Sequence, residues 1–351
     1  MSPTSKLAFP ALRPGRAATP IAFIRAIVLA YRRYGVAPAG ALARAGIDAA
    51  LLEQPDARVT AAQMEIISGH AMQELDDEAL GWFSRRLPWG SYGMLCRASI
   101  SSPQLGLALQ RWCRHHRLLT DDIGLALDVA KTAATLTVAP RRPLGEMQEF
   151  CLVTLLRYVL GYACWAIDSR IPLTESRFPF PAPRHADAYS LMFPGPVRFD
   201  AEFAGLSFDA RYLELPIRRD EAALQTMLQR ALPLTVLQYR RDRLLVEGVR
   251  RFLRDPASGP ATAETVAEHL HVSVRTLHRQ LHEEGSSLQR LKDDARRDRA
   301  IELLNRSSRS IKQISALVGF GNEKSFSRAF RTWTGVPPQT FREKGLGDKR
   351  A

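Results

Sequence analysis

The sequence predicts an α+β N-terminal domain followed by an all-α C-terminal domain with two helix-turn-helix motifs. Three observations support this fold class. Apolar residues recur at helical spacing over most of the chain, but between residues 125 and 138 they alternate as in a β-hairpin. The segment 255–260 contains two prolines and a glycine, which favours a break between domains. Beyond it, two helical segments repeat one arrangement of apolar and basic residues.

In the N-terminal part, the sequence predicts helices first and strands later. Residues 1–20 lack the apolar core of a secretory signal and predict a disordered leader. Helical segments are expected at 21–34, 39–45, 48–52, 61–75, 79–85 and 102–119, with a loop over 86–93. A hairpin turning near Lys131, a long apolar helix over 146–167, and short strands at 171–178, 197–199 and 206–208 follow. Together they predict an α+β domain over residues 21–232.

The C-terminal part predicts helices throughout. Residues 233–260 are expected to form a connecting helix, which begins at Pro233 and ends near Leu253, and then a linker. The tandem motifs are expected over residues 261–342, and residues 343–351 are a charged tail.

The second motif lies between Ser310 and Phe341. Ser310 and Asn322 are predicted N-caps of two short helices, and Gly319 permits the turn between them. Its second helix has apolar residues at i, i+4 and i+7 and polar or basic residues on the opposite face, as in a recognition helix. The apolar positions are Phe326, Phe330 and Trp333.

The first motif, within 263–285, repeats this pattern 49 residues earlier. The cap Ser273 corresponds to Asn322, and the inner residues Leu277 and Leu281 correspond to Phe326 and Phe330. The outer residues correspond pairwise as well. A pair of motifs with matching inner and outer faces is much less common by chance than one motif, so nucleic-acid binding is predicted.

The two outer faces supply the candidate DNA contacts. Four basic residues are expected to reach guanine O6 and N7 in the major groove: Arg275, Arg279, Lys324 and Arg328. Other candidates for base edges or phosphates are Thr276, His278, His282, Ser325, Ser327, Arg331 and, on the linker helix, Arg306. Glu323 could accept from cytosine N4 or serve as a helix-dipole partner. For any single arginine, the alternative is a solvated charge.

One continuous helix is predicted between the motifs, over Ser287–Asn305, with Leu288, Leu291, Ala295, Leu303 and Leu304 inward. A helix of this size is about 28 Å long, which roughly matches one turn of B-DNA of ~34 Å. The sequence therefore predicts that one chain places two recognition helices in successive major-groove segments.

The charge supports a polyanionic partner. The 351-residue chain has a formal net charge of +13, and residues 233–351 hold 23 Lys and Arg against 14 Asp and Glu. No segment is predicted to span a membrane. The four cysteines lack disulfide-framework density and Cys-x-x-Cys pairs, which is typical of a reducing cytoplasm.

The C-terminal hundred residues resemble the AraC family of bacterial transcription regulators. The similar residues are Val266-Ala267, Ser273–Leu281, Glu284-Gly285, Arg296, Ala300, Leu303-Leu304, Ile314, Gly319-Phe320, Ser325–Phe330, Thr334–Pro338 and Phe341-Arg342. The chain departs from the family at Ser315, where alanine is usual, and at Arg297, where an apolar residue is common. Because His278 and Glu323 are not generic base readers, the resemblance does not define the operator.

The N-terminal part is similar to the arabinose-binding-like partner domain of that family. The similar residues are Leu42–Gly46, Leu51-Leu52, Asp56–Thr60, Trp89-Gly90, Gly93 and Ser101–Pro103. This resemblance implies an effector-binding or dimerisation domain, and it does not imply that the ligand is arabinose.

A candidate effector pocket combines the 86–93 loop with the 146–167 helix. Its proposed residues are Trp89, Tyr92, Arg157, Tyr158 and Trp165, with the arginine placed to meet a carboxylate. The favoured alternative is that these aromatic residues are ordinary core.

Metal, cofactor and enzyme interpretations find little support. Cys113, His115 and His116 do not share one helical face, and no second cluster completes a metal site. A methyl-accepting DNA-repair protein would need four cysteines at metal-ligand spacing, which Cys96, Cys113, Cys151 and Cys164 do not have. No phosphate-loop or nucleophile-elbow pattern is present. We therefore expect no cofactor and no enzymatic activity.

The sequence as a whole predicts a cytoplasmic, sequence-specific transcription regulator, and an activator. Its expected partners are double-stranded DNA, RNA polymerase, a small-molecule effector and a second copy of the chain. The alternative is a ligand-independent architectural DNA-binding protein whose N-terminal domain only assembles a dimer.

Overall fold

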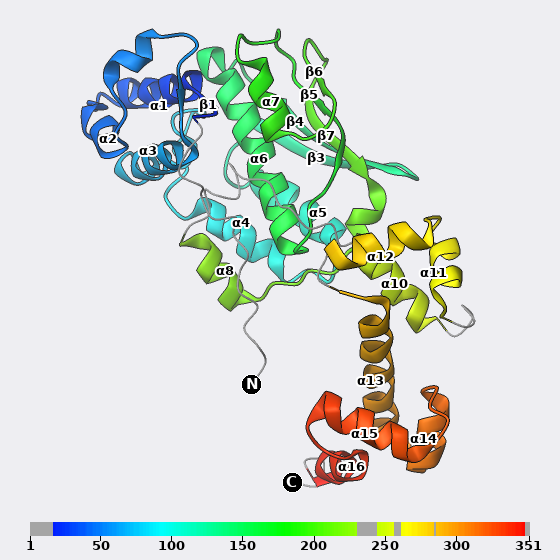
Figure 1. Ribbon diagram of the computed structural model, residues 1–351. Helices are drawn as coiled ribbons and strands as arrows, with labels where there is room; N and C mark the ends of the chain where they lie inside the picture. The colour runs from blue at the N-terminus through cyan, green and yellow to red at the C-terminus, as the bar shows by residue number, and fades with distance from the viewer. Residues whose placement is uncertain (1–16, 230–243, 256–260, 284–285, 348–351) are drawn as a thin grey trace. The chain divides into compact units, whose positions relative to one another are not determined.

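The computed structural model describes residues 17–229, 244–255, 261–283 and 286–347. The chain divides into two compact units, Met1–Asp242 and Arg243–Ala351. Figure 1 shows helices and a sheet in the first unit and helices in the second. The predicted fold class, α+β followed by all-α, is confirmed.

The first unit begins with a helical region. The two-residue strands β1 (Thr19–Pro20) and β2 (Arg58–Val59) pair, so the residues just before α1 lie beside those just before α3. The helices are α1 (Ile21–Arg33), α2 (Ala39–Arg44) and α3 (Ala61–Glu74), with the short 3-10 turn η1 (Ala49–Glu53) between α2 and β2. Thr60 and Gln63 form a capping box, which satisfies the first amide groups of α3 and fixes where it begins. The helices lie where the sequence predicted them. The pairing of β1 with β2 was not predicted, and β1 falls within the predicted disordered leader, whose residues 1–16 lie outside the described part of the chain.

The sheet has five strands in the order β3-β4-β7-β5-β6. They are β3 (Ile123–Val129), β4 (Ala133–Pro140), β5 (Leu173–Arg177), β6 (Val197–Arg198) and β7 (Ala204–Asp209). Every pairing is antiparallel except that of β5 with β6. The predicted hairpin and the three predicted strands are therefore confirmed.

Helix α6 (Gln148–Ala166) contacts β4 and β7 and forms the centre of this domain. Residues 145–166 are long and apolar enough to cross a membrane, but 83% of their most apolar window is buried within the protein. A helix that is apolar all round and covered by its own domain is a core helix. Its apolar composition therefore reflects burial within a globular domain.

The helical segment expected over 79–85 is wrong, and the reason is a buried aspartate. The Asp77 side chain is fully buried, and its carboxylate accepts the backbone N–H groups of Ala79, Gly81 and Leu87 at 2.7–2.9 Å. Two amides of the expected helix and one of the loop after it are thus tied to one side chain, and the backbone forms turns instead. The structure shows no helix over these residues.

Two boundaries also differ from prediction. The expected 86–93 loop ends early, because α4 (Ser91–Ile100), a helix that the sequence reasoning missed, begins after Gly90 at φ +105°. The expected 102–119 helix is shorter, as α5 (Leu105–His116). Helices α7 (Tyr189–Met192) and α8 (Glu221–Leu228) and the turns η2 (Gly145–Met147), η3 (Ala186–Ala188) and η4 (Ala210–Glu214) complete the unit.

The second unit contains seven described helices. They are α10 (Leu244–Arg254), α11 (Ala263–His269), α12 (Val274–Glu283), α13 (Leu288–Arg306), α14 (Ile311–Leu317), α15 (Glu323–Thr334) and α16 (Pro338–Gly347). The predicted connecting helix is described only as α10, since residues 230–243 lie outside the described part of the chain. Helix α10 packs against α11, α12 and α13, so it belongs to the C-terminal unit.

Two separate apolar cores hold this unit together, and α13 contributes to both. The first core joins α10, α11 and α12 to Leu288 and Leu291 of α13. The second joins α14 and α15 to Ala300, Leu303 and Leu304 at the other end of α13. Of the predicted inward residues of this helix, only Ala295 is not fully buried, and it lies between the two cores.

Candidate nucleic-acid interface

Helix α12 is fixed by its cap and its buried face. The Ser273 hydroxyl accepts the backbone N–H of Thr276 at 3.1 Å, which sets the start of the helix. Leu277 and Leu281 are fully buried in the first core. The opposite face leaves four of the predicted contact residues exposed: Arg275, His278, Arg279 and His282. Thr276 is half-buried, and its hydroxyl lies 2.8 Å from that of Ser273, so it also takes part in capping.

Helix α15 repeats this arrangement. The Asn322 side chain accepts the backbone N–H of Ser325 at 2.8 Å, and Phe326 and Phe330 are fully buried. Gly335, at φ +82°, ends the helix. On the other face, Ser327 is half-buried. The five other predicted contact residues are exposed: Glu323, Lys324, Ser325, Arg328 and Arg331.

Four basic residues of these faces are available to a ligand. Within the described part of the chain, Arg275, Lys324, Arg328 and Arg331 take part in no ion pair. Exposed basic side chains outside ion pairs suit the phosphates and base edges of a polyanion. The predicted phosphate contact Arg306 differs, because its guanidinium lies 3.8 Å from the Glu302 carboxylate.

Helix α13 sets the separation of the two motifs. Its 19 residues correspond to about 28 Å. Between the two cores its surface carries ion pairs three residues apart, Asp293–Arg296 and Asp294–Arg297, which support an exposed helical segment. Arg297, which departs from the family pattern, is half-buried, and its guanidinium also donates a hydrogen bond to the Asp298 carboxylate at 3.0 Å. The predicted continuous helix between the motifs is confirmed.

The five residues of the predicted effector pocket do not come together. Trp165 is fully buried, and Arg157 is buried and donates to the Met192 carbonyl at 2.6 Å. Burial lowers the Arg157 pKa to about 10. Tyr92 and Tyr158 pack together, with ring centroids 5.4 Å apart, beside a cavity of only about 30 Å³. Only Trp89 faces a space of ligand size, and it is 49% exposed.

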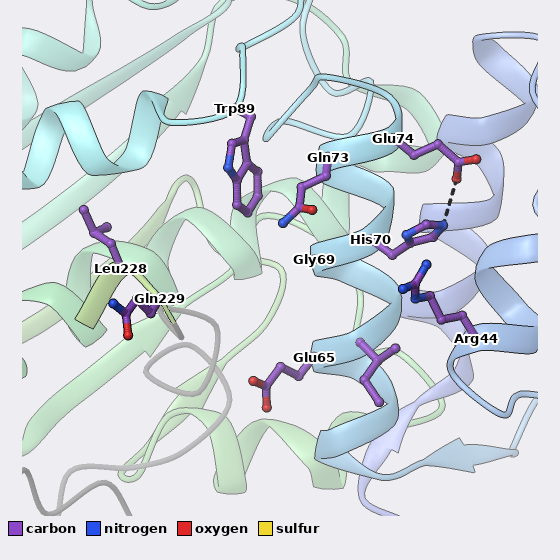
Figure 2. Close-up of a pocket in the computed structure, with 10 residues that line it drawn as sticks. Arg44, Glu65, Gly69, His70, Gln73, Glu74, Trp89, Leu228 and Gln229 are labelled. Carbon is purple, nitrogen blue, oxygen red and sulfur yellow. Dashed lines mark ion pairs between the residues drawn. The ribbon is translucent and has the colours of Figure 1, made fainter. Parts of the chain in front are cut away.

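That space is a groove of about 680 Å³ over α3, which sequence reasoning missed. Figure 2 shows residues of α3 along its floor, Arg44 on one flank, and Trp89, Leu228 and Gln229 on the other. The signal that could have found it is Ile66, an apolar residue on the polar face of α3 that is 43% exposed.

The four cysteines and His116 are buried in the first unit. All four cysteines are buried thiols, and burial raises the Cys113 pKa to about 12. His116 is buried as well, and burial lowers its pKa to about 4. Among the described residues, no three His, Cys, Asp or Glu side chains are grouped so that they could hold a metal ion.

Tandem helix-turn-helix motifs with exposed basic faces, joined to an α+β domain, define a DNA-binding regulator. Residues 35–217 match the family described as "Arabinose-binding domain of AraC transcription regulator, N-term", and residues 266–344 match a helix-turn-helix domain. The first match covers more than half of the chain, so the protein belongs to the AraC family of DNA-binding transcription regulators.

Curated relatives extend over most of the chain. It is 28% identical to the ornithine utilization regulator of Pseudomonas aeruginosa over 326 residues, 92% of this chain and 96% of the relative. It is 28% identical to the regulator VirS of Mycobacterium tuberculosis over 283 residues, 71% and 81% of the two chains.

Solved structures are also similar. The regulator CdpR of Pseudomonas aeruginosa is 21% identical and covers 92% of this chain and 98% of its own, with a TM-score of 0.31. The DNA-binding domain of AdpA, solved with a target DNA, is 27% identical and covers 30% of this chain and 96% of its own, with a TM-score of 0.27.

Proposed function

We propose that this AraC-family regulator reads two successive major-groove segments with α12 and α15, and that the N-terminal domain modulates this binding in response to a small molecule. The observation that carries the first part is the shared use of α13. One helix supplies buried residues to both cores, so it links the two recognition helices through a rigid spacer of about 28 Å. This spacing suits neighbouring major-groove segments on one face of B-DNA.

In this proposal Arg275, Arg279, Lys324 and Arg328 contact base edges. The remaining candidates, Thr276, His278, His282, Glu323, Ser325, Ser327 and Arg331, contact edges or phosphates around them. Thr276 contributes least, because its hydroxyl already faces Ser273.

A spacing experiment tests the two-segment reading. The bound sequence is first defined by genome-wide footprinting with the full chain. Five base pairs are then inserted between its two protected segments, which turns one segment to the opposite face of the duplex. We expect one segment to lose protection. As a control, five base pairs inserted outside the site should leave both segments protected. Full protection of both segments after the insertion would contradict a rigid spacer.

We also propose that the chain works as a homodimer in the cytoplasm, where it activates transcription through RNA polymerase. The relative with near-complete coverage is by its name a regulator of ornithine utilization, which favours a role in controlling metabolism. Sedimentation of the full chain tests the dimer, and transcription from the footprinted promoter with purified polymerase tests activation.

The alternative is a ligand-independent architectural protein whose N-terminal domain only assembles a dimer. The dispersal of the five predicted effector residues favours it, and the groove over α3 favours the effector-responsive regulator. Thermal shift against a metabolite panel separates the two, because a ligand that binds the native state raises the melting temperature. Promoter occupancy that no metabolite changes would support the architectural protein.

A further inference from the structure

The first helix-turn-helix motif contains all four histidines of the C-terminal unit: His269, His271, His278 and His282. The second motif, between Ser310 and Phe341, contains none. Histidine is the side chain whose charge ordinarily changes between pH 5 and 8. The two motifs therefore differ in whether their charge changes over that range.

Two of these histidines share the exposed face of α12. His278 and His282 are four residues apart, so they lie one helical turn from each other on the same side. Both are exposed, whereas Leu277 and Leu281 on the opposite side are fully buried. The histidine pair, His278 and His282, therefore belongs to the surface that α12 presents to DNA in the proposed function.

The equivalent positions of α15 carry different chemistry. His278 corresponds to Ser327 and His282 to Arg331, each 49 residues later. A serine hydroxyl carries no charge, and a guanidinium stays charged at every pH at which the protein is folded. These two positions of α15 thus keep a constant charge, whereas the histidine pair becomes positive when it is protonated.

The other two histidines are not on α12. His269 is on α11, where its ring packs against that of Phe252, with the centroids 5.0 Å apart. His271 is exposed in the turn before α12, with its backbone at φ +53°. They allow the effect of a histidine on the DNA-facing surface to be separated from that of a histidine elsewhere in the same motif.

Helix α12 itself places positive charge around the histidine pair. Arg275 precedes His278 by three residues, and Arg279 lies between His278 and His282 along the same exposed face. A nearby opposite charge favours the charged form of an ionisable group. The phosphates of DNA bound to this basic face would therefore favour the protonated pair.

Helices α10, α11 and α13 also pack against α12 and bring further charges. Glu264 of α11 is the acidic neighbour of His278. Hydrogen bonds from its own backbone N–H and from Thr262 hold the pKa of the Glu264 carboxyl below its usual range, and the charges of His278 and of Lys292, on α13, lower it further. A test of the pair must therefore separate Glu264 from DNA as its anionic partner.

The remaining charges on α10 and α11 are partly engaged or exposed. The Glu247 carboxylate lies 3.7 Å from the guanidinium of Arg250 and 4.0 Å from that of Arg254, all three on α10. Arg251 of α10 and Glu268 of α11 are exposed. Glu264 is thus the carboxylate to vary in a control.

We propose that the first motif binds DNA in a proton-linked manner, with His278 and His282 contacting phosphates as imidazolium ions, while the second motif binds independently of pH. This inference rests on the proposed reading of DNA by α12 and α15. The protonated pair attracts phosphate, so the extra affinity is fully present at low pH and is lost as the pH rises. Acidification therefore strengthens the binding of the first segment.

Fluorescence anisotropy of the full chain with its footprinted operator measures this linkage, at fixed ionic strength and with a metal chelator present. We expect the affinity to fall about tenfold from pH 6 to pH 8. The slope of log affinity against log salt should be steeper at pH 6 by about 1.8, because each neutralised phosphate contributes about 0.9. A variant with both His278→Gln and His282→Gln should lose the two effects. A tenfold fall that persists in this variant would overturn the proposal.

An exchange of side chains between the motifs locates the effect. Footprinting at pH 6 and pH 8 follows the two segments separately, once Arg279→Ala and Arg328→Ala have assigned each segment to its motif. In the unaltered protein only the first segment should lose protection at pH 8. Arg331→His should make protection of the second segment pH-dependent, and His282→Arg should reduce the dependence of the first. Equal pH dependence of both segments in the unaltered protein would contradict the assignment to α12.

Two matched controls exclude other sources of the pH dependence. His271→Gly removes an exposed histidine of the same motif that is not on α12, and Glu264→Gln removes the acidic neighbour of His278. Both variants should keep the tenfold fall. Its loss in Glu264→Gln would show that the effect comes from an ion pair within the protein, and so would refute the phosphate contact. Melting temperatures at both pH values show whether each variant is folded.

The footprints also separate this inference from the proposed function. If they form equally well at pH 6 and pH 8, the proton linkage fails and the DNA reading stands. If no footprint forms at either pH, the proposed DNA reading itself fails.

Discussion

The two helix-turn-helix motifs share one outer pattern but are stabilised by different cores. Around α12 the buried residues are aliphatic, and they meet the valines and the phenylalanine of α10. Around α15 the rings form a chain of contacts. Phe326 contacts Phe330 and Phe320, Phe320 contacts Trp333, and Phe330 contacts Phe341. The comparison teaches that the two copies have an exposed basic face in common, whereas the residues of their interiors differ.

The turns differ as well. Helices α12 and α15 are related by 49 residues, but the buried positions of α11 and α14, Val266 and Ile314, are related by 48. The second turn therefore contains one residue more. At the residue after each C-cap the backbone is left-handed, with His271 at φ +53° and Gly319 at φ +81°. Only the second motif uses glycine, the residue that adopts this conformation without strain.

The largest expected effect is the loss of stability when a buried side chain is shortened at equivalent positions of the two cores, Phe330 and Leu281. Phe330 is fully buried, with ring centroids 5.6 Å from Phe326 and 5.5 Å from Phe341. We expect Phe330→Ala to lower the free energy of unfolding of its motif by about 3–5 kcal/mol, and Leu281→Ala to lower that of the first by about 2–5 kcal/mol. Hydrogen exchange should show loss of protection in α14 and α15 for the first variant and in α11 and α12 for the second. Equal loss throughout would mean one cooperative unit.

The next comparison concerns equivalent arginines on the outer faces. Arg279→Ala and Arg328→Ala should each weaken specific binding by about 1–3 kcal/mol and relax sequence preference at its own segment. Fluorescence anisotropy with operator duplexes mutated in one segment or the other measures both effects. Arg299→Ala, on the exposed surface of α13, serves as a control for lost charge. Uniform weakening on all sequences would instead identify a phosphate contact.

Opposite substitutions in the two turns should change the free energy of unfolding in opposite directions. A Cβ on Gly319 would find no atom nearer than 3.8 Å, so Gly319→Ala should cost only the strain of the left-handed backbone, about 1 kcal/mol. His271→Gly relieves the same strain in the first turn and should be neutral or stabilising by up to about 1 kcal/mol. Thermal unfolding of the full chain measures both. Destabilisation by His271→Gly would show that its side chain has a role of its own.

The smallest effect concerns how α13 holds the second turn. The Arg296 guanidinium lies 5.5 Å from the centre of the Phe320 ring. Because this contact is partly exposed, Arg296→Gln should lower stability by only about 0.5–1 kcal/mol. A matched change on the same helix, Arg299→Gln, should have less effect, since its partner Glu302 lies in an exposed pair. A larger loss in the control would contradict a role for the ring contact.

Local patterns made the C-terminal unit predictable. Caps, apolar spacing and the Gly319 turn all act within a few residues, so Ser273, Asn322 and Ser310 could be identified directly. The N-terminal unit was less predictable where a distant partner decides the backbone. Asp77 holds 79–85 in turns by accepting the amides of Ala79, Gly81 and, beyond them, Leu87, and no local pattern predicts that its carboxylate will be buried.

The two candidate sites also differ in how far the sequence predicts them. The outer faces of α12 and α15 follow from helical periodicity alone, because every fourth residue returns to the same side. The groove over α3 brings together Arg44, Trp89 and Leu228 from three separate elements, and their proximity depends on how α2, α3 and α8 pack. The five residues of the predicted aromatic pocket lie apart for the same reason. The sequence shows which side chains could line a pocket, but the packing of distant segments decides which of them lie close together.

By itself, the sequence determined the tandem motifs, their caps, their basic faces and the helix that spaces them. The physical reason is that these features arise from hydrogen bonds and periodicity between near neighbours in the chain. Only the tertiary structure decided that α10 completes the first motif, and that Trp89 faces a groove while Trp165 is core. Those outcomes depend on packing between distant segments, where burial of one side chain is fixed by the shape of all the others.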